Sequence, residues 1–340
     1  MRTLTRPALS MVAIAVVCSL MFLATVPAGA DTEEKDVFMG NYVGSWKDSR
    51  GENSARAQVI AWGGAAYRLA FYLPQAQGEE RLEFGGKREG EKVVFESQTE
   101  DGKYTVQATL QNQKLNGSLT SGGKKKQKIG EFALQFTRIV SPTLGQPAPA
   151  GAVVLFDGTN TENWERHPPT WCVQGDGSME VCSSNLVSKV EFGDAEYHVE
   201  FCTPFMPNSR GQSRGNSGVY IQGRYEVQVL DSFGMPPAWD YCGGIYKVAA
   251  PKENACLPPL EWQTYDIIFH APRFDQAGNK VKDATITVKH NGKVIHENLT
   301  ISHPTPGGVS DQEAPRGPLM LQDHGDRVRY RNIWVKPLAE

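Results

Sequence analysis

The chain of 340 residues lacks the hydrophobic pattern of amphipathic helices. After the segment 141–150, no stretch of ten or more residues keeps apolar side chains at a 3.6-residue period, which disfavours a helical bundle. The chain also lacks the composition of a disordered protein, because 40% of its residues are hydrophobic and 21% are charged. Glycine and proline, in contrast, are plentiful, with 34 and 21 residues. This composition is typical of many short strands joined by turns, so the sequence predicts an all-β protein.

An excess of basic residues is also missing. The first thirty residues contain two arginines and no acidic residue, which leaves 33 of the 35 basic residues against 38 acidic ones, a formal charge of −5. Proteins that bind nucleic acid need a basic face toward the phosphates. We therefore expect no nucleic-acid partner.

Long hydrophobic runs are absent beyond the first thirty residues. There, Arg2 and Arg6 precede an apolar run from Leu9 to Val26, and the small residues Ala-Gly-Ala follow at 28–30. This pattern predicts a signal peptide that is cleaved after Ala30. The length of the run also leaves an uncleaved anchor open. We expect a secreted or periplasmic protein with no integral membrane span after cleavage.

Cysteine is scarce, and five of the six cysteines follow the leader: Cys172, Cys182, Cys202, Cys242 and Cys256. Export permits disulfide bonds. Cys242 and Cys256 bracket a proline-rich loop and are the preferred pair, whose closure would stabilise the fold by about 3 kcal/mol. Two of the other three cysteines can also pair, which leaves one unpaired. No cysteine spacing resembles a zinc site.

A change in composition divides the chain at residues 141–150. This segment is rich in proline and alanine and has no apolar periodicity, which predicts an interdomain linker. We expect an accessory antiparallel β domain over residues 31–140 and a second domain over 151–340. The β-rich segments of the first domain are 56–60, 67–73, 81–84, 92–97, 104–110, 114–119 and 131–139, with turns at Gly63-Gly64, Gly85-Gly86 and Asp101-Gly102.

The first domain offers little chemistry. It has no histidine and no acidic cluster that a strand would place on one face. Its aromatic residues Tyr42, Trp46, Trp62 and Tyr67 can stack on a sugar, but aromatic residues at strand spacing more often belong to a core. We assign this domain an accessory role.

The second domain is predicted to form two packed antiparallel sheets, as in a sandwich or jelly roll. Asn291-Gly292 between two β-rich segments predicts a hairpin with a type I′ turn. The segments predicted as strands are 152–156, 196–202, 218–221, 225–230, 263–269, 284–290, 293–296, 319–322 and 330–335.

Polar and apolar residues alternate after Tyr225. Strand geometry sends Glu226 and Gln228 to one face and Tyr225 and Val227 to the other. If the valine face is core, a carboxylate and an amide point into a concave sheet, and Asp231 joins them only through a bulge or at the end of the strand. The alternative is an outer polar face on a half-solvated strand.

A second polar group lies near the C-terminus. Gln322 and His324 share one strand parity, although a lone histidine is more often structural. Arg331 lies in a later strand, and an inward-facing arginine should pair with a carboxylate such as Glu226 or Asp231. Such an ion pair is equally compatible with a structural role.

Several motifs follow one another along residues 151–338. They are Leu155-Phe-Asp-Gly-Thr159 with Trp164, Asn216-Ser-Gly-Val-Tyr220, Tyr225-Glu-Val-Gln-Val-Leu-Asp231, Cys242-Gly-Gly-Ile-Tyr246, Glu261-Trp-Gln-Thr-Tyr-Asp266, His290-Asn-Gly292 and Leu321-Gln-Asp-His-Gly325 with Arg331-Asn-Ile333. This series resembles the 3-keto-disaccharide hydrolase domain family. The resemblance implies a secreted bacterial protein with a concanavalin A-like jelly roll that acts on glycosides oxidised at C3 of a sugar ring.

The implied substrate has its own chemistry. A ketone at C3 acidifies the C2 proton, so a carboxylate or an imidazole can remove it. The enolate then expels the glycosidic oxygen from C1, and water adds afterwards. Such a reaction needs a base, donors to the enolate oxygen and an acid for the leaving group.

Three side chains are candidates for the chemical step. Glu226 or His324 is the candidate base, and Asp231 is the candidate acid or the partner that orients His324. Donors to the enolate oxygen are sought among Gln222, Arg224 and Gln228. The residues expected to bind an oxidised glycoside or disaccharide are Asn216, Gln222, Arg224, Gln228, Tyr246, Trp262, Gln322 and Arg331.

Two other functions fit the same sequence. Glu226-x-Gln228-x-x-Asp231 has the spacing of the acidic strand motif of retaining glucanases, in which two carboxylates act on an unoxidised glycoside. A non-catalytic carbohydrate-binding module is the third alternative, with a stacking wall made of Trp239, Tyr241, Tyr246 and Trp262.

The sequence requires no cofactor. A divalent metal ion that polarises the ketone is nevertheless possible, because oxygen and nitrogen ligands are available. The candidate ligands are Glu226, Asp231, Asp323 and His324.

Overall fold

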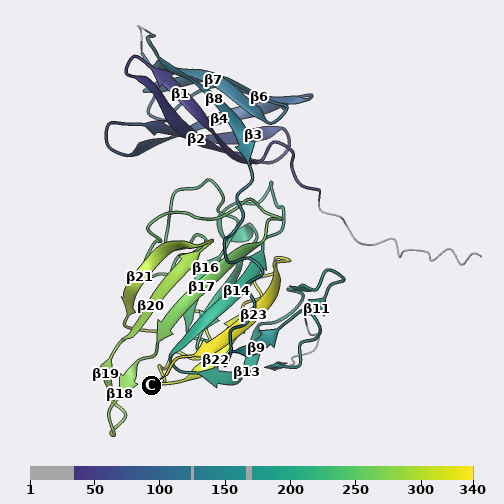
Figure 1. The fold of residues 1–340 in the computed structure, drawn as a ribbon, viewed down its shortest axis with the longest axis vertical. Helices are drawn as coiled ribbons and strands as arrows, with labels where there is room; N and C mark the ends of the chain where they lie inside the picture. The colour runs from purple at the N-terminus through teal and green to yellow at the C-terminus, as the bar shows by residue number, and fades with distance from the viewer. Residues whose placement is uncertain (1–33, 124–125, 166–170, 340) are drawn as a thin grey trace, which may run out of the picture. The chain divides into compact units, whose positions relative to one another are not determined.

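The computed structural model describes residues 34–123, 126–165 and 171–339 (Figure 1). The predicted signal peptide, with its cleavage site after Ala30, lies outside the described residues. Within the described ranges, no helix has the length and apolar character needed to cross a membrane.

The first group of strands forms a closed antiparallel barrel. Its strands are β1 (Gly40–Asp48), β2 (Gly51–Ala61), β3 (Ala66–Pro74), β4 (Glu79–Glu89), β5 (Lys92–Gln98), β6 (Tyr104–Gln111), β7 (Lys114–Ser121) and β8 (Lys128–Thr137). Each strand pairs with the next, and β1 pairs with β8 to close the barrel. The seven predicted segments fall on β2–β8, whereas β1 is missing from the prediction.

Aromatic side chains fill the barrel. Trp46, Phe71 and Phe132 are buried, with ring centroids 5.7 Å apart for Trp46 and Phe71 and 4.7 Å apart for Phe71 and Phe132. The interior of an eight-stranded barrel is just wide enough for side chains to fill it. Tyr42 and Tyr67 are buried too. These aromatic residues therefore belong to the core.

The predicted turn at Gly85-Gly86 is wrong. Both glycines lie inside β4, where Gly86 pairs with Tyr67 of β3. A Cβ atom on Gly86 would lie 2.3 Å from a ring carbon of Phe95 in β5. The glycine therefore makes room for a phenyl ring and does not reverse the chain.

The rest of the chain folds as a jelly-roll sandwich of antiparallel sheets, as predicted. Its elements are β9 (Val153–Phe156), β10 (Trp164–Glu165), β11 (Cys172–Val173), β12 (Met179–Glu180), β13 (Leu186–Phe192), β14 (Ala195–Cys202), η1 (Gly211–Ser213), β15 (Ser217–Ile221), β16 (Tyr225–Val229), β17 (Gln263–His270), β18 (Arg273–Phe274), β19 (Lys280–Lys282), β20 (Ala284–His290), β21 (Lys293–Ile301), β22 (Gly317–Leu321) and β23 (Arg329–Pro337).

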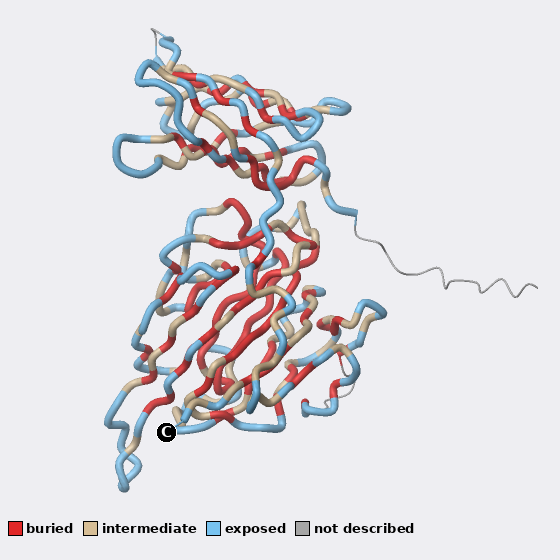
Figure 2. Tube along the Cα trace, viewed as in Figure 1, coloured by how far each residue is buried: buried red, intermediate tan, exposed pale blue. Residues whose placement is uncertain are grey.

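Two sheets of different size build the sandwich. The smaller sheet has the order β10-β13-β22-β15-β16. The larger sheet has the order β11-β12-β23-β14-β17-β20-β21, with β9 beside β23, and β18 and β19 pair separately. Figure 2 shows that the buried residues run along the central strands of this sandwich.

The two faces of β16 carry different residues. Tyr225 lies in the core between the sheets, where its ring centroid is 5.2 Å from that of Phe269 in β17. Alternation places Val227 on the same side and sends Glu226 and Gln228 to the outer face. All five residues of β16 are buried. The outer face of this strand is therefore covered, and it is not half-solvated.

The predicted hairpin turn at Asn291-Gly292 is confirmed. The two residues join β20 to β21 and have φ angles of 51° and 78°. A type I′ turn needs positive φ at both central positions, which asparagine and glycine tolerate best.

The described cysteines form no disulfide bond, so the predicted Cys242–Cys256 bond is absent from the structure. Both side chains are buried. The Cys242 Sγ atom lies 3.2 Å from the Tyr265 hydroxyl group, and the Cys256 thiol lies 3.3 Å from the carbonyl oxygen of Leu257. The two thiols also hydrogen-bond to each other inside the sandwich.

The predicted linker, residues 141–150, is bound to the outer face of the larger sheet. The backbone N–H of Gly145 donates a hydrogen bond of 2.5 Å to Glu200 Oε1. Asn332 Nδ2 donates one of 2.9 Å to the carbonyl oxygen of Gln146. These bonds fix the segment along its course, so it is not a freely moving tether.

Glu200 is the centre of a buried charge cluster. Arg331 Nε lies 2.7 Å from Glu200 Oε2, and Asn332 Nδ2 and His198 Nε2 lie 2.9 Å and 3.5 Å from Oε1. His198 Nδ1 is 2.6 Å from Asp266 Oδ1. Burial raises the pKa of Glu200, but these hydrogen bonds outweigh it and lower the pKa to about 2. The carboxylate is therefore held in its charged form.

We predict that Glu200→Gln destabilises the protein in a pH-dependent manner. A carboxyl group with a lowered pKa stabilises the fold above its ordinary pKa, and this contribution is lost as the pH falls toward about 2. At pH 7 we expect the free energy of unfolding to fall by about 3 kcal/mol, and the deficit should shrink near pH 3 in urea denaturation. Glu196→Gln, on the same strand, is the control. A pH-independent loss would contradict the assignment.

Candidate functional site

The hairpin of β15 and β16 places Tyr220 beside Glu226. The two residues are directly opposite each other in the antiparallel register. Opposite residues of an antiparallel pair have their side chains on the same face. The Tyr220 hydroxyl group donates a hydrogen bond of 2.9 Å to Glu226 Oε2, and both residues are buried.

Gly218 of β15 leaves room for the Glu226 carboxyl group. A Cβ atom at this position would lie 2.5 Å from Glu226 Oε1 and 2.8 Å from a ring carbon of Tyr220. A larger residue would therefore collide with both side chains. Steric crowding thus explains why glycine stands at the centre of the Asn-Ser-Gly-Val-Tyr motif at 216–220.

Two acceptor oxygens compete for the single proton of the Tyr220 hydroxyl group. It lies 2.9 Å from Glu226 Oε2 and also 2.9 Å from the carbonyl oxygen of Pro306. A phenol carries one proton, so it can donate to only one of these oxygens at a time. Gln322 Nε2 donates a bond of 3.2 Å to the same hydroxyl oxygen. Gln322, a predicted binding residue, therefore joins Glu226 through Tyr220.

Burial makes the Glu226 carboxyl group a weaker acid than an exposed glutamate. Only 3% of the residue is exposed. Burial raises its pKa to about 7, although the hydrogen bond from Tyr220 acts in the opposite direction. Burial and the neighbouring Glu226 charge also raise the pKa of Tyr220. A carboxyl group that titrates near neutral pH can take up and return a proton, which is what general acid–base chemistry needs.

Gln228 and Asn216 are neighbours on the same hairpin. Gln228 Nε2 donates hydrogen bonds to Asn216 Oδ1 at 2.8 Å and to the carbonyl oxygen of Ser217 at 3.1 Å. Asp326 Oδ2 accepts a bond of 2.8 Å from the backbone N–H of Asn216. These bonds fix the two predicted amide residues on the hairpin that carries Glu226.

The segment 242–246 lies along the outer edge of β16. Its backbone donates to the carbonyl oxygen of Gln228 at 2.9 Å, and the N–H of Tyr246 donates to that of Glu226 at 3.4 Å. Tyr246 therefore extends the row formed by Tyr220 and Glu226 by one position across the sheet. Tyr246, a predicted binding residue, lies next to the buried carboxyl group.

The other two catalytic candidates do not hydrogen-bond to Glu226 in the described part of the chain. Asp231 Oδ2 lies 2.7 Å from Arg214 Nε, and its Oδ1 atom accepts a bond from the backbone N–H of Phe233. His324 is exposed in the loop that follows β22. Of the three candidates, Glu226 is the one that is buried and hydrogen-bonded to Tyr220.

Gln222 and Arg224 hold the turn between β15 and β16. Gln222 Nε2 donates to the carbonyl oxygens of Phe192 and Pro315, at 3.1 Å and 3.2 Å. Arg224 Nε donates to the carbonyl oxygen of Gln312 at 2.6 Å. These donors are engaged by the backbone, which gives the two residues a structural role.

The predicted ion pair of Arg331 with Glu226 or Asp231 is wrong. Strand β23 belongs to the larger sheet, where the register pairs Arg331 with Glu200 of β14. The Arg331 guanidinium group also lies over the ring of Trp262, 4.1 Å from its centroid. Arg331 of β23 and Trp262, the residue directly before β17, are thus predicted binding residues that lie at the larger sheet, whereas Tyr220 and Glu226 lie on the smaller one.

The predicted metal ligands are dispersed in the structure. Glu226 contacts Tyr220, Asp231 pairs with Arg214, and His324 is exposed. Among the described residues, no group of three or more histidine, cysteine, aspartate or glutamate side chains is placed to hold a metal ion.

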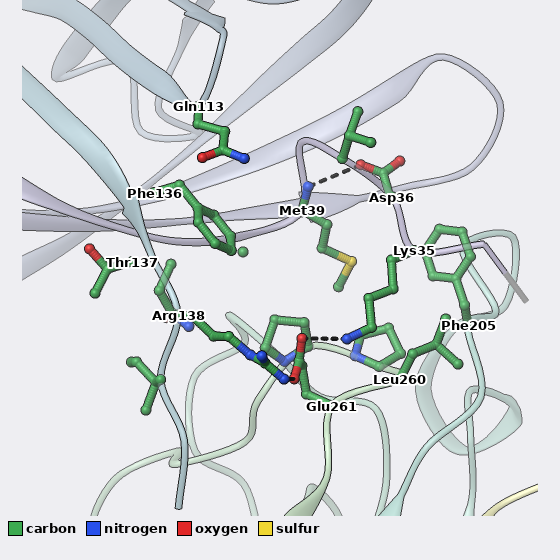
Figure 3. Close-up of a pocket in the computed structure, with 16 residues that line it drawn as sticks. Lys35, Asp36, Met39, Gln113, Phe136, Thr137, Arg138, Phe205, Leu260 and Glu261 are labelled. Atoms are coloured by element: carbon green, nitrogen blue, oxygen red, sulfur yellow. Dashed lines mark hydrogen bonds and ion pairs between the residues drawn. The ribbon is translucent and has the colours of Figure 1, made fainter. Parts of the chain in front are cut away.

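A pocket of about 220 Å³ lies elsewhere in the described part of the chain. Figure 3 shows the side chains that line it. Its lining includes Met39, Phe136 and Leu260, and Asp36 accepts a hydrogen bond of 3.0 Å from the backbone N–H of Met39. None of the predicted site residues lines this pocket. It is therefore separate from the candidate site.

Tyr220 is not among the site residues predicted from the sequence. The signal was present, because the predicted strands 218–221 and 225–230 are separated by only three residues. A hairpin that closes over residues 222–224 sets Ile221 against Tyr225 and hence Tyr220 against Glu226. Register reasoning of this kind can find the partner of a buried carboxylate.

Comparison with known proteins gives the family. Residues 151–336, more than half of the chain, match the 3-keto-alpha-glucoside-1,2-lyase-like domain. The chain belongs to this family, as its motifs predicted. A comparison with curated proteins finds no match.

Three crystal structures from Parabacteroides distasonis, each assigned as a glycosyl hydrolase, resemble the chain. The first is 37% identical, with a TM-score of 0.51 over 56% of this chain and 86% of that chain. The second is 18% identical, with a TM-score of 0.40 over 56% and 95%. The third is 23% identical, with a TM-score of 0.40 over 55% and 99%. The family and the first structure support a glycoside hydrolase-like function.

We predict that Glu226→Gln stabilises the protein at alkaline pH. The pKa of Glu226 is raised from 4.5 to about 7, so the folded protein holds the proton more tightly than the unfolded chain does. Stability therefore falls as the pH rises from 4.5 to about 7. Above that pH the variant should gain about 3 kcal/mol in the free energy of unfolding, and at pH 4 it should match the wild type. An equal shift at both pH values would contradict the raised pKa.

Proposed function

We propose that the chain cleaves 3-keto-glycosides or 3-keto-disaccharides, with Glu226 as the residue that moves the proton. The observation that carries the proposal is a buried carboxyl group with a pKa of about 7, in a chain that belongs to the 3-keto-alpha-glucoside-1,2-lyase-like family. Such a carboxylate is a stronger base than an exposed one, and the C2 proton beside a ketone is acidic enough for it to remove.

The reaction proceeds in two proton transfers. Deprotonated Glu226 takes the C2 proton, and the electrons of the C2–H bond form an enolate with the C3 ketone. The enolate then restores the ketone, forms a double bond between C1 and C2, and breaks the bond from C1 to the glycosidic oxygen. Protonated Glu226 returns its proton to that oxygen, which leaves as an alcohol. Addition of water across the new double bond completes a net hydrolysis.

Tyr220 suits both protonation states of Glu226. When the carboxyl group is ionised, the phenol donates to it at 2.9 Å. When the carboxyl group is protonated, the phenol can turn to the carbonyl oxygen of Pro306 and accept a bond from the acid instead. Gln322 steadies the hydroxyl oxygen in either case. The carboxyl group can therefore load and unload a proton while it stays hydrogen-bonded to Tyr220.

The alternatives fit the contacts less well. A retaining glucanase needs a second carboxylate about 5 Å from the first, yet Asp231 is engaged by Arg214 and by the backbone N–H of Phe233. A non-catalytic sugar-binding module has no need of a buried acid whose ionisation destabilises the fold. Destabilising groups of this kind are typical of catalytic sites.

We predict that Glu226→Gln lowers kcat on a 3-keto-glucoside by about 10²–10⁴-fold, because amide cannot accept the C2 proton. For the wild type, kcat/KM should rise with pH through about 7 and then level off, since the base must be deprotonated. Product chromatography after incubation with the 3-keto-glucoside and with its unoxidised parent is the measurement. Release from the parent would point to a glucanase, and binding without release would point to a binding module.

Tyr220→Phe tests whether Tyr220 controls the pKa of Glu226. The hydrogen bond from Tyr220 lowers the pKa of Glu226, so its removal should move the pH profile to higher values. Tyr225→Phe removes a phenol from the core-facing side of the next strand and is the matched control. If both variants keep the wild-type profile, Tyr220 does not act through the carboxyl group.

A further inference from the structure

An exposed tryptophan lies beside the proposed catalytic row. Trp239 has 41% of its surface exposed. Its ring packs edge-on against Tyr246, with centroids 5.1 Å apart and planes at 70°. Tyr246 is joined to Glu226 through the backbone. The indole is therefore one side chain away from the residue that carries the proton.

The backbone holds this tryptophan in place. Gly244 lies so close that a Cβ atom on it would be 2.2 Å from the carbonyl oxygen of Trp239. The N–H of Gly244 donates to the carbonyl oxygen of Tyr241 at 2.8 Å, and its own carbonyl oxygen accepts from the N–H of Gln228 at 2.9 Å. The loop that carries Trp239 is thus bound tightly to the edge of β16. A ring fixed in this way can bind a flat apolar surface with little loss of entropy.

We propose that Trp239 forms the subsite for the leaving group, which it binds by stacking on the apolar face of a second hexose ring. The proposal rests on the proposed function. The glycosidic oxygen must lie within reach of Glu226 when it receives the proton, so the ring attached to that oxygen lies next to the carboxyl group. Tyr246 and Trp239 occupy such a neighbouring position. Sugar rings present C–H groups that pack well on an indole.

The test compares two substrates that differ only in the leaving group. Trp239→Ala should raise KM for a 3-keto-disaccharide about ten-fold and leave kcat within about two-fold. For the methyl 3-keto-glucoside, whose leaving group has no ring, both constants should stay at the wild-type level. Trp239→Phe should restore most of the lost affinity. An equal loss on both substrates would overturn the proposal.

Binding measurements separate this proposal from the proposed function. Calorimetric titration with the unoxidised disaccharide should show weaker binding for Trp239→Ala than for the wild type, and methyl glucoside should show no difference. This result is expected even if the wild type cleaves no 3-keto substrate. Failure to cleave would contradict the proposed function but not the subsite. Ile268→Ala is the control, because Ile268 has the same exposure of 41% on the larger sheet. Unchanged disaccharide binding in Trp239→Ala would overturn the subsite.

Two exposed cysteines, Cys172 and Cys182, lie close to each other. Cys172 lies in β11, and Cys182 follows β12, the strand that pairs with β11. Their Sγ atoms are 3.3 Å apart, and both residues are exposed. The other described cysteines, Cys202, Cys242 and Cys256, are buried. A shift of about 1 Å would bring the two exposed sulfur atoms to bonding distance.

We infer that Cys172 and Cys182 form the disulfide bond of the oxidised protein. Two thiols lose two protons and two electrons to a low-molecular-weight disulfide such as oxidised glutathione, which is reduced to two thiols. The bond closes a short loop around the turn at Gly175-Asp176-Gly177. Such a closure restricts the unfolded chain and so raises the stability of the folded protein.

Peptide mass mapping after exposure to oxidised glutathione tests this inference. We expect one disulfide-linked peptide pair containing Cys172 and Cys182, and alkylation of the three buried cysteines after unfolding. Cys172→Ser and Cys182→Ser should each lower the melting temperature of the oxidised protein to that of the reduced wild type. A linked pair of Cys242 and Cys256 in place of this one, or no linked pair, would overturn the inference.

Discussion

Burial of the Glu226 carboxyl group on the outer face of the smaller sheet is the constraint on which the candidate site depends. Gly218 leaves the space for the carboxyl group, Tyr220 supplies its hydrogen bond, and the segment 242–246 covers the edge of the strand. These features bury the carboxyl group, and none of them supplies a positively charged partner. The raised pKa follows from that combination, because desolvation acts against only one neutral donor.

The two sheets treat buried carboxyl groups in opposite ways. On the larger sheet, Glu200 has a guanidinium group, an amide and a backbone N–H as partners, and its pKa falls to about 2. On the smaller sheet, Glu226 has a phenol, and its pKa rises to about 7. Equal burial therefore gives a fixed charge in one place and a movable proton in the other. This contrast is the reason that we propose Glu226, and not Glu200, for the chemical step.

Much of the fold was predictable because it follows from local patterns. Alternation revealed the central strands, and Asn291-Gly292 located the hairpin between β20 and β21. Closure of the barrel was not predictable, since it depends on the pairing of β1 with β8 across the whole first part of the chain. For the site, the alternation around Glu226 was sufficient to find the carboxyl group. The partners of Arg331 and Asp231 were out of reach, because they depend on which sheet each strand joins.

The bonds made by residues 143–146 also set the limits within which the sandwich can be produced alone. The family match begins at residue 151, but a fragment cut there would lack the N–H of Gly145 and the carbonyl oxygen of Gln146. Glu200 would then keep its charge in a partly opened, wetter environment. The hydroxyl group of Ser141 also lies 2.6 Å from that of Thr264 in β17. A fragment that keeps all these contacts therefore starts ahead of Ser141, and one that starts at residue 151 would be less stable.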